Sequence, residues 1–267
     1  MKLQLLKPFL IIILLLVSSV SYAQFINGLN HRLNLHGKVQ SCVTTQYNHL
    51  RYDTSARYKV SFDSLIFNSK GQEIKGFTTS AVRGADTNKK YCFIPKYDKA
   101  GNLTEVLSYD ENGNAEFKNA YSYSANKKLV TLKGYFLDGK HSYTNSESYK
   151  INGSGRILEK YHPNESFVPD VKCQYGKTVY KYNAKGLRVK EIEYDLNGLE
   201  ISKRFLKYNQ NNEMSESNFI WLKDQRGNEY ITFTYIKYDK HHNWLVKNMF
   251  LNGKFHSVTE RQITYYK

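Results

Sequence analysis

The sequence of 267 residues contains only three cysteines, Cys42, Cys92 and Cys173, and they lie far apart. An odd number allows at most one intramolecular disulfide and leaves one thiol over, with the pairing open. No two of them have the C-x-x-C spacing of a zinc site or a thioredoxin-like centre. A chain of this length can build its own hydrophobic core, so it needs no disulfide framework.

The sequence also lacks the local motifs that carry chemistry. The segment Asn-Gly-Ser-Gly at 152–155 does not have the G-x-S-x-G spacing of a nucleophile elbow. No glycine-rich loop has the form that cradles a phosphate. His241 and His242 are the only adjacent histidines, and no spacing recurs as a set of metal ligands requires. We therefore expect no catalytic residue, no metal and no cofactor, and a protein that is not an enzyme.

One group of carboxylates alternates along a predicted strand. Glu191, Glu193 and Asp195 fall on the same face of that strand. They could supply half of an acid–base pair. The preferred interpretation is a solvated face beside Lys190.

The first residues have the three-part layout of a secretory signal peptide. Lys2 and Lys7 precede the apolar segment at 9–17, and small residues follow it. Cleavage is expected after Ala23. The apolar run at 9–17 is shorter than the roughly 20 residues of a spanning helix. We expect a signal peptide at 1–23 and a mature chain that begins at Gln24 and has no membrane span. The protein would then act in the periplasm, at the cell surface or outside the cell.

Positive charge is in excess. The formal net charge is +15, and the mature chain without its two leader lysines carries two charges fewer. Aromatic residues make up 15% of the chain, which is too many for a disordered tail. A positive surface keeps a protein soluble and attracts polyanions. Because the chain is exported, we expect no nucleic-acid partner. The partners that we then expect are an anionic polysaccharide, lipid headgroups or another envelope protein.

The most regular feature is a repeated Tyr-Asp-x-x-Gly pattern, as in Tyr97–Gly101. Asp or Asn begins a type I turn by accepting a backbone hydrogen bond. The glycine takes a left-handed conformation, and together they make a β-hairpin connection. Asn212 and His242 replace the glycine in two copies and belong to the residue types that tolerate positive φ. The predicted structural turn residues are Asp98, Gly101, Asp110, Gly113, Asn183, Gly186, Asp195 and Gly198.

The segments between the turns alternate apolar and polar residues, which is typical of half-buried strands. Turns recur at steps of 12 and 14 residues, so each 26-residue unit contains two strands. In 187–194 the apolar phase slips, and a β-bulge would explain the slip. The predicted fold class is all-β: a long antiparallel β-meander of repeated hairpins, curled into an open trough or barrel-like sheet.

The rhythm of the turns also divides the chain. After the signal peptide at 1–23, we expect an N-terminal segment and first strand at 24–57 and a repeat block at 58–160. A second repeat block follows at 178–267. Between the blocks, 161–177 contains two of the four prolines and is predicted to be a long loop.

The segment Tyr-Asp-x-x-Gly-Asn-Leu at 97–103 resembles the YD repeat of the RHS/YD-repeat proteins. The C-terminal segment 235–267 is similar to the end of short exported bacterial proteins built from degenerate copies of that repeat. The resemblance covers about 58–267. It implies extended β-sheet built from hairpins and, in some family members, binding of carbohydrates or surfaces. It implies no activity that can be assigned residue by residue.

The candidate binding residues combine aromatic rings with lysines on predicted strands. Lys203, Phe205 and Lys207 share one strand face, and Trp244 is predicted to share a face with Phe250. Such groups suit sugar stacking or contact with a polyanion. The alternative is that the rings build the buried side of the sheet and the lysines protect its edges. The full candidate set is Trp221, Trp244, Lys203, Phe205 and Lys207.

The function that these features favour is a non-enzymatic exported β-repeat protein that binds an envelope glycan or another polyanion. One alternative is a protein-interaction module that uses the edges or face of a long sheet. A third hypothesis is an enzyme whose residues converge from distant strands.

Overall fold

The structure is a computed structural model. It describes residues 35–50, 53–80, 90–125, 129–137, 144–153, 156–161, 175–222 and 227–267. The expected signal peptide, most of the expected loop at 161–177 and Cys173 lie outside the described residues. Among the described residues, none forms a helix long and apolar enough to cross a membrane.

The described part of the chain is all-β, as predicted. Tyr161 ends one strand and Tyr175 begins the next, so both ends of the expected loop are strand. The strands are β1 Val39–Leu50, β2 Asp53–Phe67, β3 Glu73–Ser80, β4 Lys90–Tyr97, β5 Leu103–Tyr109, β6 Ala115–Tyr123, β7 Leu129–Phe136, β8 Thr144–Ile151, β9 Ile157–Tyr161, β10 Tyr175–Tyr182, β11 Arg188–Asp195, β12 Glu200–Tyr208, β13 Met214–Trp221, β14 Glu229–Tyr238, β15 Trp244–Leu251 and β16 Lys254–Tyr265.

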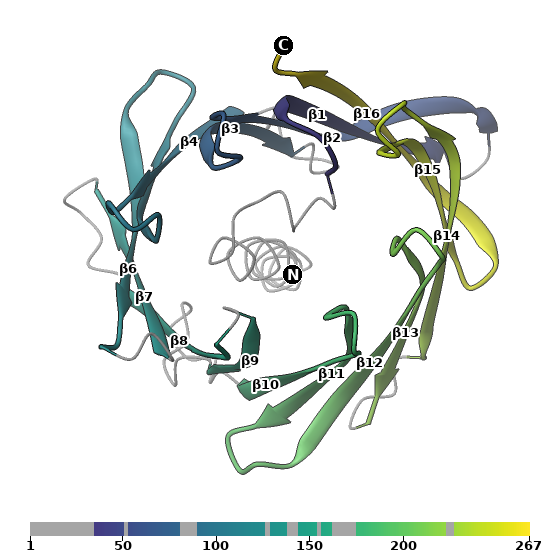
Figure 1. Cartoon of the computed structure of the whole chain (residues 1–267). Coiled ribbons are helices and arrows are strands. Elements are labelled where there is room, and N and C mark those ends of the chain that lie inside the picture. Colours follow the sequence, from purple (N-terminus) through teal and green to yellow (C-terminus); the bar gives the residue numbers. More distant parts are fainter. Residues whose placement is uncertain are drawn as a thin grey trace, which may run out of the picture.

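These strands form one closed antiparallel barrel in sequence order (Figure 1). β1 pairs with β16 from Val39 opposite Tyr265 to Asn48 opposite Ser257. The prediction of a trough or barrel-like sheet is thus confirmed in its barrel form. The two predicted repeat blocks share this single sheet. Because the first and last strands pair with each other, the described barrel has no free β1 or β16 edge for a partner strand. Protein interaction through a face of the sheet, the other form of that alternative, stays a prediction.

The predicted turns are confirmed. At Asp110, one carboxylate oxygen accepts hydrogen bonds from the N–H groups of Asn112 and Asn114, at 2.9 and 2.7 Å. Gly113 follows in the left-handed region at φ 82°. Asn212 and His242 occupy the same turn position at φ 61° and 64°, as their tolerance of positive φ predicted. The repeat therefore encodes hairpin connections.

The two ends of the barrel differ. In an antiparallel barrel joined in sequence order, every second connection lies at the same end. At one end, which we call the short-turn rim, six turns share a hydrogen bond from the N–H of their first residue to the carbonyl of the residue four positions on. These turns begin at Asn68, Asp98, Asn152, Asn183, Asn209 and Asp239. The β6–β7 connection at this end instead bonds the N–H of Ser124 to the carbonyl of Leu129, and at the other end the turns that begin at Asp110 and Asp195 have the same bond as the six. The end with the connections β5–β6, β11–β12 and β15–β16 is called the opposite rim.

Tyrosines link neighbouring turns along the short-turn rim. The hydroxyl of Tyr123, at the end of β6, donates to the carbonyl of Leu103 at the start of β5, at 2.8 Å. Tyr208 donates in the same way to Arg188 across β12 and β11, at 2.7 Å. In each pair, the two strand ends belong to successive turns of the rim, and Lys185 also donates to Asn212 of the next turn at 3.4 Å. The repeated tyrosine therefore ties each turn to the next one along the rim.

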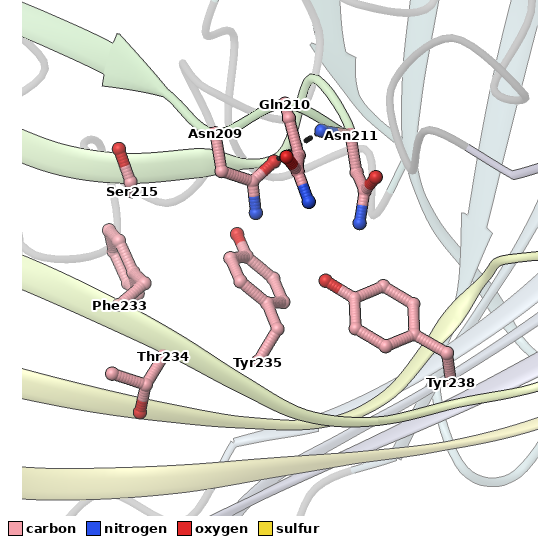
Figure 2. Close-up of a pocket in the computed structure, with 8 residues that line it drawn as sticks. All are labelled: Asn209, Gln210, Asn211, Ser215, Phe233, Thr234, Tyr235 and Tyr238. Atoms are coloured by element: carbon pink, nitrogen blue, oxygen red, sulfur yellow. Dashed lines mark hydrogen bonds between the residues drawn. The ribbon is translucent and has the colours of Figure 1, made fainter.

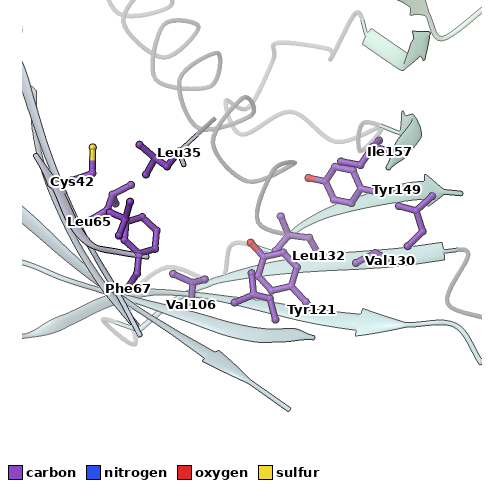
Figure 3. Packing of buried hydrophobic residues seen from close by; sticks show 13 residues of the cluster. Leu35, Cys42, Leu65, Phe67, Val106, Tyr121, Val130, Leu132, Tyr149 and Ile157 are labelled. Carbon is purple, nitrogen blue, oxygen red and sulfur yellow. The ribbon is translucent and has the colours of Figure 1, made fainter. Parts of the chain in front are cut away.

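One face of the sheet is buried in a common apolar cluster. It includes Cys42 of β1, Phe67 of β2, Tyr121 of β6 and Tyr149 of β8. Figure 3 shows these side chains on the same side of the strands. In a closed barrel, side chains from strands so far apart around the wall can meet only inside, so this face is the inner face.

Bulges shift the alternation along several strands. Lys181 of β10 lies opposite Lys190 of β11, and the next residue, Tyr182, lies opposite Arg188. One residue of β11 is therefore passed over, which confirms the bulge expected from the apolar slip in 187–194.

Candidate functional site

An open pocket of about 570 Å³ lies where the β12–β13 turn faces β14. The side chains of Gln210 and Asn211 come from the turn, while Phe233, Tyr235 and Tyr238 come from β14. Figure 2 shows the amide groups pointing across the pocket toward the two tyrosine hydroxyls. None of its lining side chains is charged. The pocket thus places amide donors and acceptors opposite aromatic rings.

The turn that carries the amides is fixed by its own hydrogen bonds. Asn209 accepts from the N–H groups of Asn211 and Glu213, at 2.9 and 3.0 Å. On the other wall, the Tyr235 hydroxyl donates to the carbonyl of Met214 at 2.8 Å. Because both walls are held by backbone contacts, the pocket is preformed.

A cluster of cations and rings adjoins the pocket through Tyr235. The Tyr235 and Trp244 rings lie 5.9 Å apart in an edge-on arrangement. The Arg261 guanidinium is 3.5 Å from the centre of the Trp244 ring, and the Lys247 ammonium is 4.7 Å from it. Burial, followed by the charge of Arg261, lowers the pKa of Lys247 to about 8. Trp244 is only 4% exposed, so its ring packs against protein cations and offers little surface to a ligand.

The carboxylates of β11 lie on the inner face, which corrects the expectation of a solvated face. Glu193 lies opposite Thr178 of β10 and Ser202 of β12, both of which are buried. Burial raises the pKa of Glu193, and the 2.5 Å hydrogen bond from Ser202 opposes that rise. Glu191 forms an ion pair with Arg188 at 3.1 Å. In a closed barrel the inner face of a strand can also carry polar groups. The alternation of residue types alone therefore could not show whether Glu193 faces the interior or the solvent.

A second charged group is buried further along the inner face. The Lys160 ammonium, 2% exposed in its side chain, lies 2.9 Å from the Glu147 carboxylate. The Tyr149 hydroxyl donates to the same carboxylate. Lys160 and Glu147 thus neutralise each other's charge inside the barrel, and both are already bound to protein groups.

The five predicted binding residues do not come together. Lys203, Phe205 and Lys207 do share a face, but it is the outer one, because they alternate with Ser202, Arg204 and Leu206, of which Ser202 and Leu206 are buried. Trp221 and Trp244 lie on the inner face: Trp221 packs on Phe219 at 4.5 Å, and Trp244 sits among the cations described above. The candidate set is therefore divided by the barrel wall, and its role in binding stays a prediction.

The predicted pairing of Trp244 with Phe250 on one face is wrong. Phe250 packs edge-on against Phe255, with ring centres 5.6 Å apart. It lies opposite Thr232, next to the inward-facing Phe233, so Phe250 faces outward. The register shifts twice where β14 meets β15, at Lys237, and this irregularity breaks the strict alternation that the prediction assumed.

No group of three or more potential metal ligands occurs among the residues that the structure describes. Cys42 and Cys92 are free thiols. Cys42 is buried, and burial raises its pKa, so this thiol is poorly placed to react.

Comparison with known proteins identifies the fold. No family model matches the chain, and no curated protein matches its sequence. A porin-like protein from Bacteroides uniformis is similar in structure, with a TM-score of 0.52 and 10% identity, over 86% of this chain and 99% of that one. The pore of the Photorhabdus luminescens Tc holotoxin gives 0.34 at 9% identity, over 72% and 14% of the two chains. A DUF1329 family protein from Desulfovibrio piger gives 0.30 at 9% identity, over 89% and 90%.

The first of these comparisons shows a porin-like barrel fold, and the other two scores are too low to carry an argument. This corrects the resemblance to the RHS/YD-repeat proteins. The motif on which it was based is a hairpin turn whose chemistry is local, so it recurs wherever antiparallel strands need that connection. Here the turns close a barrel that matches a porin-like protein over nearly its whole length.

Sequence reasoning missed the pocket because its amides lie in a degenerate turn. The segment Asn209–Asn212 was recognised only as a turn that had lost its glycine. The signal was present: Gln210 and Asn211 place two amide side chains side by side at the centre of the turn, a combination that the other copies of the motif do not have. Their partner rings are on β14, and only the barrel fixes which of its side chains face the turn.

Proposed function

We propose that the protein is an exported, non-enzymatic barrel that binds a glycan in the pocket between the β12–β13 turn and β14. The observation that carries this proposal is the arrangement of amides opposite rings: Gln210 and Asn211 face Tyr235 and Tyr238 (Figure 2). Amide groups can both donate to and accept from sugar hydroxyls. Tyrosine offers a flat apolar face together with a polar tip. This combination suits a ligand that has hydroxyls on its rim and C–H groups on its face.

The pocket favours an uncharged part of the glycan. Its lining residues carry no formal charge, so attraction through net charge is not what would hold a ligand there. Composition alone predicted a polyanionic ligand, whereas the lining of this pocket favours the uncharged part of a glycan. An acidic glycan could still enter, but its recognition in this pocket would come from hydroxyl contacts and ring stacking.

The polar side chains on the outer face of the barrel support the proposal that the barrel is surrounded by water. Ion pairs cross between neighbouring strands on that face: Lys96 with Glu105 at 2.7 Å, and Lys207 with Glu216 at 2.8 Å. Lys133 of β7 is exposed there without an acidic neighbour directly opposite on β6 or β8. A lysine on the lipid face of a membrane barrel costs about 2–4 kcal/mol at mid-depth. A wall with such side chains fits an aqueous compartment better than a lipid interior.

The compartment in this proposal is the cell envelope or the space outside it. The signal-peptide layout of the first residues supports export, and a porin-like barrel fold is compatible with an envelope protein. Glycans are abundant partners in that setting for a protein that binds them without changing them.

The absence of enzymatic activity is part of the proposal. The inner-face carboxylates are each bound to a protein neighbour: Glu191 to Arg188, Glu193 to Ser202 and Glu147 to Lys160. None of them lines the pocket. Glycoside hydrolysis by the usual pair of carboxylates would require such groups within reach of the bound ligand.

The proposal is tested by titrating the purified exported protein with a panel of neutral and acidic oligosaccharides, using calorimetry. Tyr238→Ala removes one ring of the pocket and should weaken binding at least about tenfold, because one aromatic stacking contact is worth about 1–3 kcal/mol in other ligands with ring faces. Tyr238→Phe keeps the ring and loses only the hydroxyl, so it separates stacking from hydrogen bonding.

The matched control is Tyr230→Ala. Tyr230 lies on the same strand, β14, but at the opposite rim, where it is 41% exposed. This variant should bind like the wild type. If no oligosaccharide binds, or if the two alanine variants lose affinity equally, the pocket is not a glycan site. Release of a cleaved or modified sugar during the titration would contradict the non-enzymatic part.

A further inference from the structure

We propose that the short-turn rim docks the barrel, end-on, against a membrane surface that carries anionic lipid headgroups. This inference does not depend on the glycan pocket. It rests on how charge is distributed along the barrel axis. The rim combines regular turns with exposed lysines, and the described residues of the opposite rim include more carboxylates than lysines.

Lysines occupy the turns and chain ends at this rim. Four of them lie within the turns themselves, and the other two lie just before β1 and just after β16. All six are exposed: Lys38, Lys70, Lys99, Lys185, Lys240 and Lys267. Five of them, Lys240, Lys267, Lys38, Lys70 and Lys99, come from neighbouring connections on either side of the β1–β16 pairing, and Lys185 lies farther around the barrel (Figure 1). They therefore form a broad arc of the rim with one further lysine beyond it.

A second set of lysines stands directly behind the turns on the outer face. Each comes one residue before the end of its strand, where the chain enters a turn. All five are exposed: Lys96, Lys150, Lys181, Lys207 and Lys237. Three of these make ion pairs with glutamates on the neighbouring strand. Lysine holds this position in five of the strands that run into the rim, while β2 and β6 have Ile66 and Ser122 there. These five lysines place positive charge at one level of the rim.

The aspartates at this rim accept hydrogen bonds within their own turns, and two of its glutamates are buried. Asp98 accepts from the N–H and the side-chain amide of Asn102, at 2.8 and 2.7 Å. Asp239 accepts in the same way from the N–H groups of His241 and Asn243, at 2.8 and 2.9 Å. Glu73 and Glu213 are 0% and 5% exposed. The charge that this rim presents to solvent is therefore mainly positive.

The opposite rim has the reverse balance among the described residues. Its turns and adjacent strand ends carry four carboxylates that are partly or fully exposed, Glu111, Glu116, Glu200 and Glu229. Asp110 and Asp195 also lie there, but they accept turn hydrogen bonds as Asp98 and Asp239 do. These carboxylates are set against three lysines, Lys90, Lys177 and Lys254. Among the described residues, positive charge is therefore concentrated at the short-turn rim, and an anionic surface would attract that rim.

The geometry favours a flat partner over a linear one. Six turns at this rim share one length and one hydrogen-bond pattern, and the β6–β7 connection, in which Ser124 bonds to Leu129, is one residue longer. The six equal turns therefore end at a similar level. Charges act over a Debye length of about 8–10 Å near physiological salt. A planar layer of headgroups can come within that distance of the whole rim at once. A single polysaccharide strand can follow only part of it.

The test is co-sedimentation of the exported protein with vesicles of phosphatidylcholine alone or with 30% phosphatidylglycerol. The variant replaces the four turn lysines together: Lys70, Lys99, Lys185 and Lys240→Gln. The control removes the same charge away from the rim: Lys90, Lys118, Lys133 and Lys254→Gln. All eight side chains are partly or fully exposed, and a melting curve verifies that both variants fold.

We expect binding to the anionic vesicles only, and a loss of at least about tenfold in the rim variant, since each lysine near such a surface contributes a several-fold factor. The control should lose much less. Equal losses would show that net charge alone acts, and would overturn the proposal. It would also be overturned if the wild type bound neither vesicle, or if it bound soluble polygalacturonate through the same four lysines but not the vesicles.

Discussion

The side chain of Asn243 forms a pair of hydrogen bonds with the backbone of His36, which lies 207 positions earlier in the sequence. The His36 N–H donates to the Asn243 carbonyl oxygen at 2.6 Å, and the Asn243 amide donates to the His36 carbonyl at 2.9 Å. The same amide donates to the Tyr265 hydroxyl at 2.6 Å. One fully buried side chain thus joins the start of the barrel, its last turn and its last strand.

Asn243→Ala should lower the free energy of unfolding by about 2 kcal/mol or more, because it removes several hydrogen bonds and leaves their partners unpaired. The matched control is Asn102→Ala at the same position of the β4–β5 turn. Asn102 is more exposed and bonds only within its own turn. Urea unfolding measures both, and similar losses would mean that the link to His36 is unimportant.

Gly113→Val should destabilise the protein by more than about 1 kcal/mol, because a β-branched residue is strained at φ 82°. A Cβ at Gly113 meets no atom within 4 Å, so the cost comes from the backbone conformation and not from a clash. Gly113→Asn should cost much less, since Asn212 holds the same conformation in another turn. If the two substitutions have equal effects on thermal unfolding, the left-handed position is not what makes glycine necessary.

Lys160→Met should cost about 3–5 kcal/mol, because it leaves the Glu147 carboxylate buried beside an apolar side chain. The double variant with Glu147→Gln should recover much of that loss, since it removes the uncompensated charge. A double-mutant cycle by chemical denaturation gives the coupling directly. Additive effects would contradict a tight pair.

Stability should rise with pH between about 8 and 10 because of Lys247. Its pKa is lowered to about 8 in the folded barrel, against about 10.4 in an unfolded chain. In that range the unfolded state binds more protons, so raising the pH favours the folded state. Lys247→Met should flatten this rise. Urea unfolding at pH 7, 8, 9 and 9.5, with a reductant to keep the thiols reduced, compares the two slopes; parallel slopes would rule out this role for Lys247.

The parts of the fold that could be predicted are those with a local cause. The Asp98 and Asp110 turns follow from side-chain capping and glycine conformation within five residues, and they appear as expected. The bulge near Arg188 could be found because it displaces apolar residues within one strand. These features need no information from distant strands.

The parts that could not be predicted depend on contacts far apart in sequence. Trp244 and Phe250 were placed on one face because nothing in β15 itself shows the register shift with β14. Glu193 was assigned to solvent because a polar residue on a half-buried sheet usually faces water, whereas a closed wall has an inner side that accepts charge. The pocket needs a turn and a strand that approach each other only in the finished barrel.

The pairing of β1 with β16 also sets the order of events when the chain acquires its structure. The two strands that complete the circle stand at opposite ends of the barrel's sequence, so the last step cannot occur until the C-terminal strand is available. Contacts of such long sequence separation are slow to form. Until then, two unpaired strands remain open to other chains. Premature chain termination just before residue 254 would therefore yield a product with a permanently open seam, prone to join with its own copies.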